Sequence, residues 1–168
     1  MGKITSNIIR FFTVVIIQVL LIDQMPLSIY IRPAFYIYIL LCLPIAFPRW
    51  AELIVAFLLG ITIDSFSNTP GLHSFSCVLI GYLRPYLIPL LVNEEDRKIG
   101  LTPSLILFGW NTYIKFTSIL LFIHHCVLFS LESFSFGGWW QTILRIILST
   151  SVCLGFIVLV ELVKKNHR

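Results

Sequence analysis

The chain has 168 residues, of which 58% are hydrophobic and only 12% are charged, and its formal net charge is +4. Soluble domains are about 45–50% apolar and about 25% charged, so this composition excludes a soluble enzyme, a nucleic-acid-binding domain and a disordered scaffold. Because about 20 consecutive apolar residues span the hydrocarbon core of a bilayer, the sequence predicts an integral membrane protein.

The apolar residues gather into six segments separated by short polar connections. A helical span needs about 20 residues and a connection about 4–8, so this length accommodates six crossings without a separate soluble domain. We therefore predict an all-α, polytopic integral membrane protein whose single transmembrane domain covers residues 1–168. The six predicted transmembrane helices are residues 4–22, 34–47, 50–63, 72–91, 113–131 and 141–162.

The first three spans follow closely on one another. The first apolar run is longer than the core of a signal peptide, and no small-residue cleavage site follows it, so we expect it to be retained as a span. The second span starts with aromatic residues and ends at Pro44 and Pro48. Arg49 and Trp50 then form a basic, aromatic turn that is typical of a membrane–water interface. The third span ends at Asp64.

The later spans are interrupted by prolines and by single charges. We expect two prolines in the last turns of the fourth span to bend or end that helix. The run 101–131 contains 31 residues, which at 1.5 Å each exceed the core thickness of about 30 Å. Lys115 divides this run, so we predict a membrane-surface segment at 101–112 ahead of the fifth span. The sixth span carries Arg145 in its first turns and ends in a basic tail.

Basic residues are unevenly distributed between the two sides of this arrangement. Cytoplasmic connections of membrane proteins are enriched in Lys and Arg. Ten of the twelve basic residues fall on the side that holds both ends of the chain, and the other side has Arg32 and Arg145. Both termini are therefore predicted to be cytoplasmic.

The reactive side chains form no recognisable catalytic or metal-binding motif. The sequence contains no zinc-binding HExxH, no nucleophile elbow and no glycine-rich phosphate loop. Asp23, Glu52, Glu132 and Glu161 fall at predicted span ends, where we expect their charges to reach water. His124 and His125 are neighbours on a helix and point about 100° apart, so they are poorly placed to share a metal. We predict a protein that is not an enzyme and has no cofactor.

The segment 60–84 (GITIDSFSNTPGLHSFSCVLIGYLR) is the most distinctive part of the chain. Asp64 or Asn68 is suited to cap backbone N–H groups, Gly71 permits a positive φ, and His73 is expected at the wet interface. These residues predict a tight turn between the third and fourth spans. The alternative is a polar pocket on the outer side of the membrane.

The same segment carries a family resemblance. The order Gly60-x-x-x-Asp64, Pro70-Gly71-Leu72-His73 and Tyr82-x-Arg84 resembles the membrane protein MreD of the bacterial rod-shape system. The layout agrees, since six short spans with Gln18 in the first and Pro44 near the end of the second are similar to that family.

This resemblance implies a non-enzymatic component of the cell-elongation complex, which organises lateral peptidoglycan synthesis in the cytoplasmic (inner) membrane. The implied partners are MreC, the actin-like MreB, RodA and a transpeptidase, together with membrane lipid and without nucleic acid. We also expect the charged connection 93–100 and the basic tail to meet cytosolic partners or anionic lipid. The candidate partner-interaction residues are Asp64, Gly71, His73, Tyr82, Arg84, Glu94, Glu95, Asp96, Arg97 and Lys98.

A second interpretation comes from another likeness. Chains of this kind are also similar to the small substrate-binding membrane subunits of energy-coupling-factor vitamin transporters. Such a subunit needs an outward cavity with several convergent polar groups. The candidates for that role are Asp64, Asn68, His73, Asn111 and Arg145.

Overall fold

The computed structural model describes residues 11–22, 30–94, 101–133 and 138–166. Within these ranges the chain is helical and forms no β-strand. The all-α prediction is thereby confirmed. Of the six predicted spans, four correspond to described helices that are long and apolar enough to cross a membrane. These helices are α3 (Arg49–Ser67), α4 (Leu72–Leu91), α5 (Leu105–Glu132) and α6 (Trp139–Asn166).

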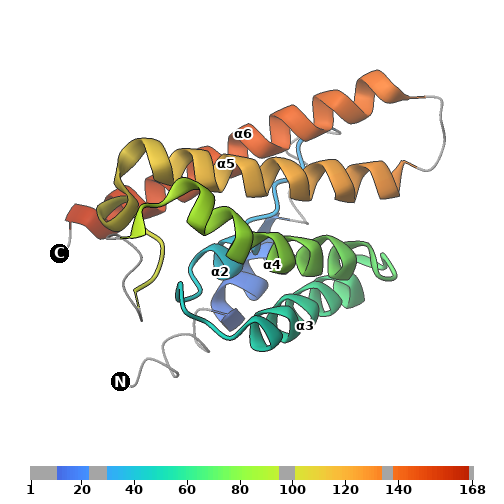
Figure 1. Cartoon of the computed structure of the whole chain (residues 1–168). Coiled ribbons are helices and arrows are strands. Elements are labelled where there is room, and N and C mark those ends of the chain that lie inside the picture. Colours follow the sequence, from blue (N-terminus) through green and yellow to red (C-terminus); the bar gives the residue numbers. More distant parts are fainter. Residues whose placement is uncertain (1–10, 23–29, 95–100, 134–137, 167–168) are drawn as a thin grey trace.

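The long helices form two antiparallel pairs, α3 with α4 and α5 with α6. The pairs meet where α4 packs against α5. In Figure 1 the α3–α4 turn and the start of α6 lie at the right, whereas the starts of α3 and α5 and the end of α6 lie toward the left. We call these two sides of the bundle the Trp139 end and the Arg49 end.

Four of the predicted spans, 50–63, 72–91, 113–131 and 141–162, lie inside these helices. One predicted boundary is wrong. The break in the run 101–131 falls at Gly109, whose φ of 72° and ψ of 166° interrupt α5, and not at Lys115. Glycine adopts this conformation without the steric cost that a side chain brings. Lys115 is an exposed residue inside the helix.

The predicted helical span 34–47 is also wrong as a continuous helix. This part of the chain contains only α2 (Ile37–Leu41), a single five-residue turn that covers about 7.5 Å. Proline lacks an N–H and disfavours helical backbone in the residue before it. Pro33 and Pro44 bracket the ten residues 34–43, which leaves room for fewer than three helical turns, and Pro48 follows. We call residues 30–48 the broken segment.

The broken segment descends beside α6 from the middle of that helix toward its C-terminal part. The backbone N–H of Arg32 donates to the Ser149 hydroxyl at 3.0 Å, and further along the Tyr38 hydroxyl donates to Glu161 at 2.8 Å. Ser149 and Glu161 are twelve residues apart on α6, or about 18 Å. The segment therefore travels in the same direction as α6, toward the Arg49 end.

A short N-terminal helix makes hydrogen bonds to the first residues of the broken segment. The apolar helix Phe11–Leu20 continues into the π-helical turn η1 (Gln18–Ile22). These residues belong to the first predicted span, whose residues 4–10 lie outside the described ranges. The buried Gln18 side chain donates to the Pro33 carbonyl at 3.1 Å and accepts from the Phe35 N–H at 3.0 Å. One side chain thus replaces two hydrogen bonds that a helix would have made.

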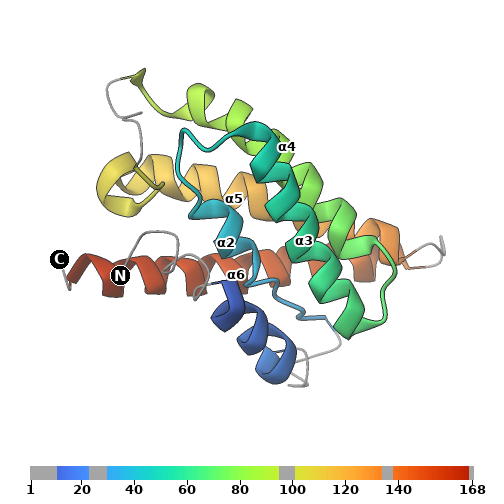
Figure 2. The same cartoon turned by 90° about the horizontal axis from the view of Figure 1, so that it is seen from below.

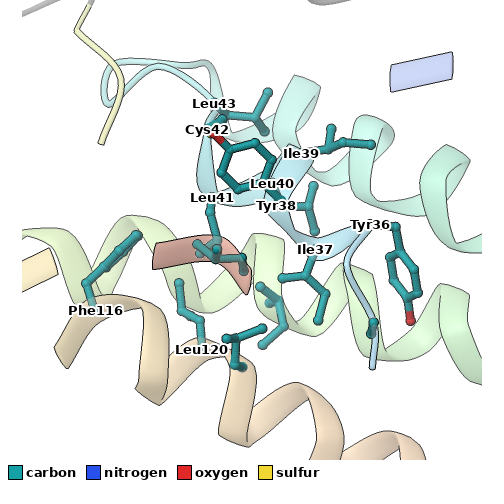
Figure 3. Close-up of a cluster of buried hydrophobic side chains, with 14 of the residues drawn as sticks. Tyr36, Ile37, Tyr38, Ile39, Leu40, Leu41, Cys42, Leu43, Phe116 and Leu120 are labelled. Atoms are coloured by element: carbon teal, nitrogen blue, oxygen red, sulfur yellow. The ribbon is translucent and has the colours of Figure 1, made fainter. Parts of the chain in front are cut away.

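The core of the molecule forms around the broken segment. Tyr36 and each residue through Leu43 are buried. Figure 3 shows these side chains pointing to several sides of the segment, with Ile37 and Leu41 on the side of Leu120 of α5. Leu120 and the neighbouring Phe116 are fully buried. Figure 2, seen from below, places α2 among α3, α5 and α6. The space inside the four long helices is therefore filled by the chain itself.

The α3–α4 pair is held close by small residues. A Cβ atom added to Gly60 would lie 2.3 Å from the Ser74 Cα atom, and one added to Gly81 would lie 3.1 Å from the Ala56 Cβ atom. Small residues let membrane helices approach closely enough for extensive van der Waals contact. Gly60 is thus required by packing against α4.

Replacing Gly60 by alanine is expected to separate the two helices. The added methyl group meets backbone atoms that cannot rotate away, and overpacking of this kind costs about 1–3 kcal/mol. Gly155 on α6 is the matched control, because its added Cβ meets no atom within 4 Å. Thermal unfolding of the purified protein in detergent should show a clear loss for Gly60→Ala and none for Gly155→Ala. Equal unfolding temperatures would contradict the close approach.

Candidate functional site

Asp64 joins the end of α3 to the start of α4. Its buried carboxylate accepts hydrogen bonds from the His73 N–H at 3.0 Å, the Ser74 N–H at 2.9 Å and the Ser74 hydroxyl at 2.6 Å. The Thr69 hydroxyl donates to the same carboxylate at 3.0 Å. The first N–H groups of a helix have no partner inside it, and a negative charge there also interacts favourably with the helix dipole. The predicted capping role of Asp64 is confirmed.

The turn between these helices depends on left-handed backbone. Gly71 has a φ of 85°, as predicted, and Asn68 has a φ of 53° and ends α3. Both residue types adopt positive φ more readily than others. The turn is thus short enough to bring the N-terminus of α4 onto the Asp64 carboxylate.

His73 takes part in a chain of polar side chains that crosses the bundle. The Tyr36 hydroxyl lies 2.7 Å from His73 Nδ1 and 2.9 Å from His124 Nε2. A hydroxyl has one proton to donate, so it donates to one ring and accepts from the other. His73 is half-buried and not simply solvated, which corrects the expectation of a residue at the wet interface. The chain connects the broken segment to α4 and α5.

Arg84 forms a second buried connection near the Arg49 end. Its Nη1 atom donates to Glu52 Oε1 at 3.0 Å, and both side chains are 1% exposed. The other terminal nitrogen of Arg84 donates to the Leu43 carbonyl of the broken segment. Charged groups at membrane depth pair with one another or with backbone carbonyls, and Arg84 does both.

Two of the three predicted span-end carboxylates that the structure describes do not reach water, and Asp23 lies outside the described residues. Glu52 is paired with Arg84, and Glu161 is buried with the Tyr38 hydroxyl and Lys164 as its hydrogen-bond donors. The prediction failed because each carboxylate has its partner on a distant element. Glu132 agrees better with expectation, since it is exposed and pairs with Arg32 at 2.9 Å.

Of the remaining candidate residues, the structure describes Tyr82 and Glu94. Tyr82 is 53% exposed on the outer surface of α4, where its ring lies 5.3 Å from that of Tyr86. Glu94 is exposed just after α4. Glu95, Asp96, Arg97 and Lys98 lie outside the described residues. The structure therefore brings Asp64, Gly71 and His73 together at the turn and places Arg84 about three turns further along α4.

Sequence reasoning missed the partners that complete these contacts. Each partner is distant in the sequence. Tyr36 lies 37 residues before His73 and 88 residues before His124. Glu52 lies 32 residues before Arg84. An available signal was a carboxylate and an arginine in successive apolar runs, because unpaired charges are expensive there. In the described part of the chain, no three His, Cys, Asp or Glu side chains are grouped so that they could hold a metal.

A comparison with protein families bears directly on this arrangement. The model of the family described as rod shape-determining protein MreD matches residues 3–163. The chain belongs to the MreD family. No curated relative and no solved structure matches it. In this MreD-family chain, four of the residues that carried the sequence resemblance fix the α3–α4 pair: Gly60 by close approach, Asp64 and Gly71 at the turn, and Arg84 through its ion pair.

The ion pair of this MreD-family chain should be costly to break from either side. Glu52→Leu or Arg84→Met leaves one buried charge without its partner, a change that typically costs about 3–5 kcal/mol. The double variant removes both charges and should lose much less than the sum of the single losses. A double-mutant cycle on unfolding in detergent measures this coupling.

Arg49→Met provides the control for removing an arginine from the same region. Arg49 donates to the Tyr86 hydroxyl at 3.5 Å in an exposed position, so its loss should cost under about 1 kcal/mol. Additive losses for Glu52→Leu and Arg84→Met would contradict the ion pair.

Proposed function

We propose that this chain is a non-enzymatic component of the bacterial cell-elongation complex, which helps determine rod shape by organising lateral peptidoglycan synthesis. The family match over residues 3–163 carries the proposal. The geometry supports it, because Asp64, Arg84 and Glu52 bind other parts of the same chain and form no reactive constellation among the described residues. Their chemistry is that of a scaffold with a fixed surface.

The proposed partners are MreC and, through it or directly, MreB, RodA and the elongation transpeptidase. The α3–α4 turn with Asp64, Gly71 and His73 is the proposed contact for a membrane or periplasmic partner. The connection 93–100 is proposed to meet cytosolic partners, because it is the longest charged run of the chain. The proposed location is the cytoplasmic (inner) membrane.

The proposed topology has both termini in the cytoplasm and six passes, of which the second is the broken segment. Its contacts support this assignment, since they follow α6 from Ser149 to Glu161 and end where Ile45 donates to the Leu101 carbonyl at 2.9 Å. Non-helical backbone is tolerated at membrane depth where protein surrounds it. The Trp139 end then faces the periplasm.

The alternative role, substrate binding for a vitamin transporter, gains no support. A ligand site needs polar groups that converge on a cavity. Asp64 caps α4, and His73 lies against Tyr36. Asn111 is exposed near the start of α5, at the Arg49 end. The broken segment occupies the interior that such a cavity would need.

Variants at the α3–α4 turn test whether a partner protein binds there. Asp64→Ala removes the cap of α4 and costs about 0.5–2 kcal/mol, and Gly71→Leu strains a positive φ by about 1–2 kcal/mol. We expect both proteins to insert at normal levels yet fail to restore rod shape and MreC capture in cells that lack the wild-type chain. Microscopy, immunoblotting and affinity capture measure these three properties.

Thr62→Ala is the matched control for these turn variants. Thr62 is near the same end of α3, and its hydroxyl donates only to the Leu58 carbonyl of its own helix. It should retain rod shape. If an Asp64→Ala, His73→Ala double variant restores rod shape at normal protein level, the turn has no role in partner binding.

Reporter fusions test the proposed topology. A periplasm-active enzyme fused after Arg168 should be inactive, and the same enzyme inserted between residues 134 and 137 should be active, because Lys and Arg concentrate on the cytoplasmic side. Immunoblots establish that both fusions accumulate. Activity of the fusion after Arg168 would reject the proposed orientation.

A further inference from the structure

Arg145 stands apart from the other basic residues that the structure describes. Arg32 pairs with Glu132, Arg84 with Glu52 and Lys164 with Glu161. Arg49 contacts Tyr86, and Lys115 and Lys165 are exposed. Arg145 is half-buried, and its Nε atom is buried without a hydrogen-bond partner in the described part of the chain.

The position of Arg145 makes an unpaired charge expensive. It lies six residues into α6 from Trp139, or about 9 Å along the helix. Trp139 and Trp140 are both strongly exposed, as in the aromatic belt at a membrane interface. Arg145 therefore lies just below the headgroup level of one leaflet. A cation at this depth requires a counter-charge or a path to water.

The groups around Arg145 do not supply that counter-charge. The Thr142 hydroxyl, one turn before it, donates to the Ser133 hydroxyl at 3.1 Å. Ser149, one turn after it, accepts from the Arg32 N–H. Glu132 already binds Arg32 at 2.9 Å. Among the described residues, the polar rim at this end of α5 and α6 therefore has one carboxylate for two guanidinium groups. Asp64, the other described carboxylate at the Trp139 end, is bound to the start of α4.

We propose that Arg145 binds the phosphate of an anionic phospholipid from the leaflet at the Trp139 end. A guanidinium presents planar, forked donors that fit phosphate oxygens. A phosphatidylglycerol headgroup carries one negative charge, which balances the excess of one positive charge on this rim. Its acyl chains lie against the exposed apolar side chains Leu148 and Val152, which follow Arg145 by three and seven residues and so lie on the same face of α6. On the proposed topology this is the periplasmic leaflet.

Tryptophan fluorescence can read lipid binding at this position. In a Trp50→Phe, Trp110→Phe background, the emission comes from Trp139 and Trp140, which lie within two turns of Arg145. The full-length protein is reconstituted in phosphatidylcholine vesicles that contain increasing fractions of brominated phosphatidylglycerol, and quenching measures which lipid occupies the neighbouring site. We expect roughly a fivefold preference for the anionic lipid, the factor that corresponds to one basic residue at a membrane surface.

Variants assign that preference to the side chain. Arg145→Gln should lower the preference for phosphatidylglycerol over phosphatidylcholine to about one. Arg145→Glu should reverse that preference, since a carboxylate repels the anionic headgroup. Lys115→Gln removes an exposed cation from the first half of α5, nearer the Arg49 end, and should leave the preference unchanged. An unchanged preference in Arg145→Gln would overturn the proposal. Unfolding temperatures in detergent establish that the variants fold.

Two further arms exclude other sources of negative charge. Inorganic phosphate should reduce the quenching no more than chloride does at equal ionic strength, and a specific reduction would identify free phosphate as the ligand. Asp23→Asn should leave the preference unchanged. Asp23, which lies outside the described residues, and Asp64, whose carboxylate binds the start of α4, are the acidic residues other than Glu132 on this side of the predicted topology. A changed preference in Asp23→Asn would identify an internal counter-charge and overturn the proposal.

Discussion

Backbone polar groups at membrane depth must find partners inside the protein, because no water is present to bind them. The broken segment makes this requirement severe, since only five of its residues are helical. Gln18 binds the backbone at Pro33 and Phe35, Cys153 donates to the Ala34 carbonyl, and Arg84 donates to that of Leu43. The surrounding helices therefore contribute one specific side chain after another to a single irregular stretch of chain.

These contacts also explain why the α3–α4 pair is constructed as it is. Arg84 can reach the Leu43 carbonyl only if its charge is balanced, and Glu52 supplies that balance from α3. Close approach at Gly60 brings the start of α4 to the Asp64 carboxylate. His73, positioned by that cap, then reaches Tyr36 of the broken segment. Turn, ion pair and interior thus depend on one another, and the outer surface of the pair is fixed as a consequence.

The sequence predicted the parts of this structure that follow from local chemistry. Continuous apolar runs predicted the long helices, and the Asp64 cap and the positive φ of Gly71 followed from residue type. The broken segment was not predicted, because its residues are as apolar as a span, although its prolines signalled the interruption. The burial of Glu52 had one signal in the sequence, an arginine in the next apolar run, whereas the burial of His124 had none. Each depends on a partner on another element, brought near by packing.

The most direct measurement of this account is a disulfide crosslink between the broken segment and α6. With Cys42, Cys77 and Cys126 replaced by serine, Ala34→Cys should form a disulfide with Cys153, whose Sγ atom lies 3.4 Å from the Ala34 carbonyl oxygen. Mass spectrometry of the oxidised protein in membranes identifies the linked peptides. The account predicts efficient crosslinking to Cys153 and none when Cys153 is replaced by serine and Ser151→Cys places the thiol on the exposed face of α6. Equal crosslinking to both positions, or none to Cys153, would contradict it.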